Sequence, residues 1–109
     1  MRYIRVQWNH KFPEEPVEIF SELDDAGWEI RKIEVFPDGS LGSASRMETN
    51  GPTVLGDEPV PPLDEIAADQ QFKPARISRE EFEEIWSRRF TPITTTDRFP
   101  LDQRSRGQR

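Results

Sequence analysis

Six glycines and prolines within 14 residues, between Thr49 and Pro62, interrupt the chain and exclude a long helix or a central strand there. This loop has room for at most a short strand at Thr53–Leu55, followed by an extended, polyproline-like segment. Regular structure is therefore expected mainly before the loop and again after it. Because the whole chain has 109 residues, it can bury one modest core, and its function is expected to lie on the surface.

The first part of the chain predicts a strand followed by a long helix. Residues 2–8 alternate between apolar and polar side chains, as a half-buried strand does. Pro16 suits the first turn of a helix that continues to about Ala26, and Gly27 can supply its left-handed C-terminal cap. The apolar residues of this expected helix, which would face the core, are Val17, Ile19, Phe20, Leu23 and Ala26.

A hairpin is expected after that helix. Pro37–Ser40 is a strong turn sequence, so a strand at residues 28–36 should fold back on a strand at residues 41–47. The apolar residues change phase within the first of these strands. This change indicates a bulge near Arg31–Lys32 or apolar contacts on both faces.

The C-terminal part of the chain predicts two helices. A short one is expected at residues 63–68, directly after the proline-rich loop. A better-marked helix begins at Ser78, because Ser78 and Glu81 can form a capping box and Ile77 can pack on Phe82 across the first turn.

These elements predict an α+β fold. We expect a small antiparallel sheet of three to four strands in the order β-α-β-β, with a long helix and a C-terminal helix packed on one face. A curled, barrel-like sheet with the last helix plugging one end is the alternative. Residues 1–90 are expected to form this single domain. Residues 91–109 lose periodicity and predict a flexible basic tail.

The net negative charge is confined to the expected domain. Residues 1–90 contain 11 Lys+Arg and 19 Asp+Glu, a net charge of −8, whereas residues 91–109 carry a net charge of +2. Binding of nucleic-acid phosphates requires a basic footprint that the domain lacks, so no nucleic-acid partner is expected for it. A basic protein is the partner that this charge favours.

The sequence contains neither cysteine nor a long apolar segment. The lack of cysteine excludes a disulfide framework, thiolate catalysis and sulfur-ligated zinc. The N-terminal residues do not form the apolar core of a signal peptide, and no stretch approaches the roughly 20 apolar residues of a membrane span. A cytoplasmic protein without a membrane partner is therefore expected.

Four carboxylates would share one narrow sector of the helix expected at residues 16–26. They follow i, i+3, i+7, i+10 spacing, and the residues are Glu15, Glu18, Glu22 and Asp25. No lysine or arginine interrupts them. The pattern predicts either a solvated, solubilising face or a docking surface for a cationic partner.

No motif for catalysis, metal binding or cofactor binding is found in the sequence. A single histidine and scattered carboxylates give neither zinc spacing nor a calcium loop, so no metal and no cofactor are expected. His10 follows the first strand, where it is a candidate with Trp8 and Arg31 for lining a pocket. A structural hydrogen bond from His10 to the next loop is favoured over a catalytic role.

Several runs of residues form a signature that extends through most of residues 1–90. They are Trp8-x-His10-x-Phe12-Pro13-x-Glu15-Pro16, then Ser21-Glu22-Leu23-Asp24-x-x-Gly27-Trp28-Glu29-x-Arg31-Lys32, then Asp38-Gly39, Pro59-x-Pro61, Glu65-Ile66 and Ile77-Ser78-x-Glu80-x-Phe82-Glu83-x-Ile85-Trp86. With this signature the chain resembles an uncharacterised bacterial domain family of unknown function. The resemblance implies no catalytic residue. The chain is also similar in size and charge to immunity proteins of bacterial toxin systems. This likeness is only an analogy and does not establish a function.

The sequence thus predicts an acidic protein-binding module, in the form of an immunity or inhibitor protein that neutralises a basic partner such as a toxin. The alternative is a small-ligand-binding or enzymatic domain with a pocket around Trp8 and His10, bounded by the loop at residues 59–62. A third hypothesis is that a partner adds a strand to the edge of the strand at residues 41–47. The sequence does not specify an oligomeric state.

Overall fold

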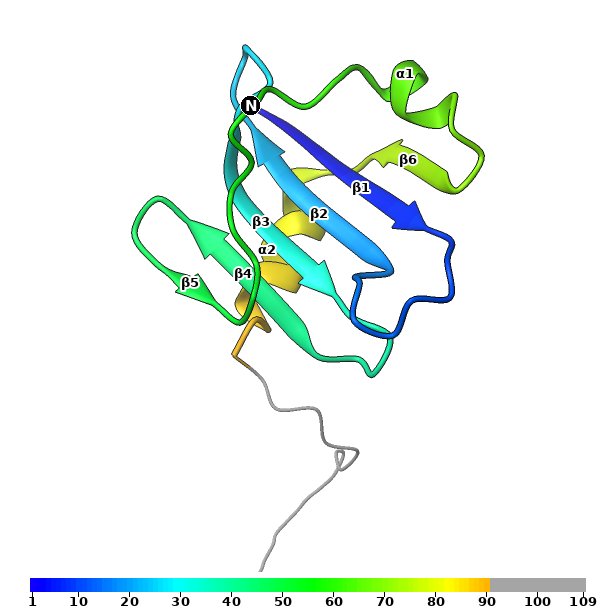
Figure 1. Cartoon of the computed structure of the whole chain (residues 1–109). Helices are drawn as coiled ribbons and strands as arrows, with labels where there is room; N and C mark the ends of the chain where they lie inside the picture. Colours follow the sequence, from blue (N-terminus) through cyan, green and yellow to red (C-terminus); the bar gives the residue numbers. More distant parts are fainter. Residues whose placement is uncertain (91–109) are drawn as a thin grey trace, which may run out of the picture.

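Paired strands make up most of the regular structure in residues 1–90, which are the residues that the computed structural model describes. The elements are β1 (Arg2–Trp8), β2 (Glu18–Leu23), β3 (Glu29–Val35), β4 (Leu41–Ser45), β5 (Thr49–Asn50), α1 (Leu63–Ala67), β6 (Phe72–Arg76) and α2 (Arg79–Ser87). Their strands form one antiparallel sheet of six in the order β5-β4-β3-β2-β1-β6 (Figure 1).

The expected sheet of three to four strands with a long helix is wrong, because residues 18–23 form the central strand β2 instead of a helix. Its apolar residues alternate between two covered faces, with Ile19 on one face and Phe20 on the other. A strand that is apolar on both sides lacks the simple alternation of a half-buried strand, and its pattern resembles that of a helix. The strand β2 is also only six residues long, whereas the expected helix would cover residues 16–26.

The sheet is covered on both faces by different parts of the chain (Figure 1). The helix α2 packs on one face, where Phe82 and Ile33 are fully buried and the ring of Tyr3 lies 5.5 Å from that of Phe82. The chain between β5 and α1 crosses the other face. There Ile4, Val6 and Leu23 form a core cluster, against which Val60, Leu63, Ile66 and Phe72 pack. The two faces therefore have separate small cores that share the sheet, instead of the single core expected from the chain length.

The hairpin and the C-terminal helix agree with the sequence-based expectations. The strands β3 and β4 pair around the turn that Pro37–Ser40 predicts. Glu22 lies opposite Arg31 while Leu23 lies opposite Glu29, so one residue of β3 is extra, next to the expected bulge. The capping box of α2 is confirmed, because Ser78 and Glu81 each bond the other's backbone N–H.

The proline-rich loop is held against the sheet by a close contact at Gly42. A Cβ at this position would overlap the side chain of Thr53, which is only 1% exposed and donates a hydrogen bond to Glu34 over 2.7 Å. Gly42 therefore allows the loop to approach the strand, as the small residues of this strand suggest. The short strand expected at residues 53–55 does not form, and pairing stops at β5.

The edge strand β6 was not expected from the sequence. It contains Pro74, which has no N–H to donate and is therefore confined to sheet edges. The short helix α1 confirms the helix predicted at residues 63–68. The basic tail expected at residues 91–109 lies outside the described residues. No helix within residues 1–90 is long and apolar enough to cross a membrane.

Candidate functional site

A groove lies between the sheet and the chain that crosses it, and we name it the β1–α1 groove. Its floor is made by Ile4 and Val6 of β1 and Ile19 of β2. Its walls are Val60 and Pro61 of the loop, Ile66 of α1 and Phe72 of β6. The cavity measures about 350 Å³, which is near the lower end of the 300 to 1,000 Å³ that is typical of ligand pockets.

Hydrogen bonds hold the outer wall of the groove in place. The Val60 N–H donates to the Gly27 carbonyl over 2.8 Å, and the Gly56 N–H donates to Glu29 Oε1 over 2.6 Å. Gly27 has a φ of 91°, a left-handed conformation that favours glycine, and it lies in the turn before β3 instead of capping a helix. The groove is therefore present before any partner binds.

An ion pair forms part of the lining of the groove. Lys32 Nζ lies 3.2 Å from Glu29 Oε1 and donates to the Val54 carbonyl over the same distance. The Ser21 hydroxyl donates to Glu29 Oε2 over 3.3 Å. Because the Glu29 and Lys32 side chains are only 6% and 15% exposed, they neutralise each other within the protein.

Exposed carboxylates lie in and beside the loop and helix that form one wall of the groove. Residues 57–69, which we name the acidic segment, carry Asp57, Glu58, Asp64, Glu65 and Asp69. All five are exposed, and none belongs to an ion pair within residues 1–90. Glu65 and Asp69 also line the groove. The groove thus combines an apolar interior with a rim of uncompensated negative charge.

The four carboxylates predicted as a helical stripe do not form one surface. Glu18 and Glu22 lie on β2, where Glu18 pairs with Arg5 over 2.7 Å and Glu22 pairs with Arg31. Glu15 is exposed in the turn before β2, and Asp25 lies in the turn after it, 3.8 Å from the N-terminal amine. The i, i+4 spacing of Glu18 and Glu22 also fits a strand, in which both side chains face the same side.

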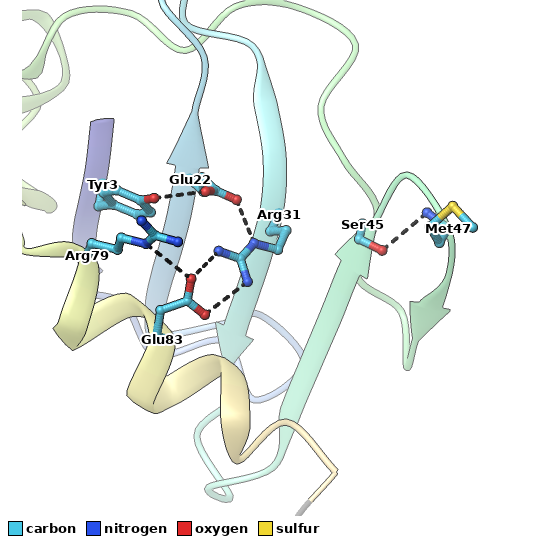
Figure 2. A network of polar contacts seen from close by, with 7 residues as sticks. All are labelled: Tyr3, Glu22, Arg31, Ser45, Met47, Arg79 and Glu83. Atoms are coloured by element: carbon cyan, nitrogen blue, oxygen red, sulfur yellow. Dashed lines mark hydrogen bonds and ion pairs between the residues drawn. The ribbon is translucent and has the colours of Figure 1, made fainter. Parts of the chain in front are cut away.

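Arg31 lies at the centre of a polar network under α2 (Figure 2). Its guanidinium donates two hydrogen bonds to Glu83, over 3.1 and 2.7 Å, and a third to Glu22. The rings of Phe82 and Trp86 lie 4.8 and 5.0 Å from Arg31 Cζ. Arg31 is therefore on the opposite face of the sheet from the groove, and it does not meet Trp8 or His10.

The pKa values of the acids in this network reflect their partners. Burial pushes the pKa of Glu22 upward, but hydrogen bonds from Arg31 and Tyr3 outweigh it and leave the pKa below its ordinary value. Hydrogen bonds from Arg31 also lower the pKa of Glu83. The pKa of Tyr3 is raised, first by burial and then by its bond of 2.9 Å to Glu22. The network is thus charged at neutral pH and ties α2 to β3.

Trp8 and His10 line an open hollow of about 600 Å³ at the end of β1. The backbone N–H of Phe12 donates to His10 Nδ1 over 2.9 Å, and His10 Nε2 donates to the Pro16 carbonyl over 2.7 Å. The two ring nitrogens are therefore both used, Nδ1 as an acceptor and Nε2 as a donor. The indole of Trp8 lies 4.3 Å from the imidazole and donates to Gln71. His10 shapes the loop after β1.

Replacing His10 with alanine is expected to lower the free energy of unfolding by about 1 to 2 kcal/mol, because two loop hydrogen bonds are lost. Urea denaturation measures this change, with the exposed neighbour Lys11→Ala as the control. Hydrogen exchange of the Phe12 amide should accelerate in the variant. Unchanged exchange at Phe12 would contradict the structural role of the imidazole.

The groove was missed by sequence reasoning, although one signal was available. No lysine, arginine or histidine occurs between Arg46 and Lys73, while six carboxylates do.

Within residues 1–90, no three histidine, aspartate or glutamate side chains gather as metal ligands would.

Comparison with known proteins gives one match. A family model described as "Domain of unknown function (DUF6881)" matches residues 2–91. No curated protein and no solved structure is similar enough to the chain to count as a match.

Proposed function

The chain belongs to this family of domains of unknown function, and from its surface we propose that it is a protein-binding module whose partner is basic. The observation that carries the proposal is the acidic segment at residues 57–69. Its five carboxylates have no cationic neighbours along the chain from residue 47 to residue 72. Such a surface accelerates encounter with a cationic partner and disfavours an anionic one.

Four carboxylates elsewhere are in different surroundings. Glu18, Glu22, Glu29 and Glu83 form ion pairs with arginine or lysine side chains of the same chain. Their charge serves the internal structure of the protein. The acidic segment instead presents its charge to solvent, next to the groove, and this supports its use in recognition.

The form of binding that we favour is inhibition. A small acidic domain that covers the cationic, substrate-binding surface of a toxin enzyme would neutralise that enzyme without chemistry of its own. Both ring nitrogens of His10 are used in loop hydrogen bonds, which supports a binding module over an enzyme that uses this histidine.

Removing the charge of the acidic segment is expected to reduce capture of the partner at least about tenfold, since electrostatic steering raises association rates by 10-fold to 1,000-fold. The variant changes all five carboxylates to amides: Asp57→Asn, Glu58→Gln, Asp64→Asn, Glu65→Gln and Asp69→Asn. Capture from a lysate of the source cells is measured by quantitative mass spectrometry.

The matched control removes five other exposed charges, so that both variants have the same net charge. Its changes are Glu14→Gln, Glu15→Gln, Asp25→Asn, Glu80→Gln and Glu84→Gln. The control should capture the partner as the wild type does. Binding should also weaken between about 0.1 M and about 1 M salt, as the screening length falls from about 10 to about 3 Å. Equal capture by both variants, or a partner without a basic surface, overturns the proposal.

A further inference from the structure

We propose that the β1–α1 groove holds one apolar side chain of a basic segment of the partner. This inference rests on the proposed function and specifies what the partner must present. The recognised segment would carry an aromatic or large aliphatic residue with lysine or arginine on either side. The groove would bind the apolar residue, and the acidic segment would bind the cations.

The groove interior favours an apolar group. Ile4, Val6 and Ile19 form the floor, and Val60, Ile66 and Phe72 are only partly buried around it. The one cation that lines it, Lys32, is already paired with Glu29. A ligand therefore meets no free positive charge inside the groove and gains mainly by burying apolar surface.

The rim decides the charge of the ligand. Glu65 and Asp69 stand at the edge of the groove and have no ion-pair partner within the described residues. An anionic amphiphile would have to approach these carboxylates and is disfavoured. A ligand with cationic groups beside its apolar part is favoured by the same charges.

The extent of the acidic segment favours a peptide over a small molecule. A single cationic head group could pair with Glu65 or Asp69, but Asp57, Glu58 and Asp64 would remain without a partner. Several cations spaced along a chain can use all five carboxylates. The small volume of the groove, about 350 Å³, also suits one inserted side chain better than a large ligand.

The test uses two synthetic peptides and the full-length protein. One peptide is Lys-Lys-Gly-Phe-Gly-Lys-Lys, and the other has alanine in place of phenylalanine. Nuclear magnetic resonance titration at low salt gives the affinity and the residues that respond. We expect the phenylalanine peptide to shift the resonances of Val60, Ile66 and Phe72 and to bind at least about tenfold more tightly than the alanine peptide.

Protein variants provide the second comparison. Ile66→Gln places a polar group in the groove wall and should remove the preference for phenylalanine. Val54→Gln is the matched control, since Val54 is 63% exposed and does not line the groove, and it should keep the preference. The comparison between the two peptides requires no variant, so it remains valid if Ile66→Gln fails to fold.

The outcomes separate this inference from the proposed function. Equal binding of both peptides, with shifts only in the acidic segment, overturns the groove proposal and leaves the basic partner in place. Shifts from neither peptide also overturn it, while lysate capture judges the proposed function independently. If Phe99→Ala alone, without peptide, changes the groove resonances, then the occupant is the chain's own C-terminal segment and the partner proposal for the groove is wrong.

Discussion

Replacing Arg31 with methionine is expected to lower the free energy of unfolding by about 3 kcal/mol, the lower end of the range for breaking a buried ion pair. The change leaves Glu22, whose side chain is 10% exposed, without its cation, and it leaves Glu83 with only Arg79, at 3.8 Å. Glu83 keeps 40% of its side chain in solvent, which limits its penalty. Urea denaturation of the wild type and the variant measures the loss.

A triple variant is the control for this prediction. Arg31→Met combined with Glu22→Gln and Glu83→Met removes all three charges, while the new amide oxygen at position 22 can still accept from Tyr3. Its stability should lie within about 1 kcal/mol of the wild type, because replacing a whole buried pair by apolar groups is often neutral. If the single variant is as stable as the triple one, uncompensated carboxylates do not cause the loss of stability and the prediction is wrong.

The pH dependence of stability provides an independent readout of the same network. The pKa values of Glu22 and Glu83 are lowered in the folded protein, whereas in the unfolded chain they return to the ordinary value of 4.5. The unfolded chain therefore binds more protons in this range. The stability that these groups contribute is present above pH 4.5 and is lost as the pH falls through their lower folded values. Arg31→Met should show a shallower decline over this range.

Local signals in the sequence predicted the local parts of the fold. The alternation of residues 2–8, the turn at Pro37–Ser40 and the capping box at Ser78 each depend on neighbouring residues, and the structure contains all three elements. The strand β2 was mistaken for a helix because its surroundings are set by tertiary structure. Only the covering of both faces explains why its residues are apolar in both phases.

The candidate site could not be predicted in the same way. The β1–α1 groove combines residues of β1, β2, the proline-rich loop, α1 and β6, which are far apart in the sequence. No periodic pattern connects such segments. The sequence shows that the domain is acidic. It placed the binding carboxylates on a helix at residues 16–26, where the structure has the strand β2. Once Glu18 and Glu22 are paired on β2, residues 57–69 remain as a run of five unpaired carboxylates beside the β1–α1 groove.

Replacing Phe82 with alanine is expected to lower the free energy of unfolding by about 4 kcal/mol, within the range for deleting a fully buried aromatic ring. Phe82 is 0% exposed and contacts the ring of Tyr3 and the guanidinium of Arg31. Ile85 is the other buried residue of α2, so the apolar contacts of the helix depend mainly on these two side chains. The loss therefore includes the cavity, the ring contacts and support for the Arg31 network, and urea denaturation measures it.

The two faces of the sheet make this prediction informative about function as well. Met47→Ala is the control for stability, since Met47 is 88% exposed and should change little. In the folded Phe82→Ala protein, affinity for the phenylalanine peptide should stay within about twofold of the wild type, because distant sites are nearly additive. The groove is on the opposite face and shares no lining residue with α2.

A stability loss below about 1 kcal/mol would contradict the anchoring role of the ring. A large loss of peptide affinity in the folded variant would show that the face bearing α2 and the face bearing the groove are coupled.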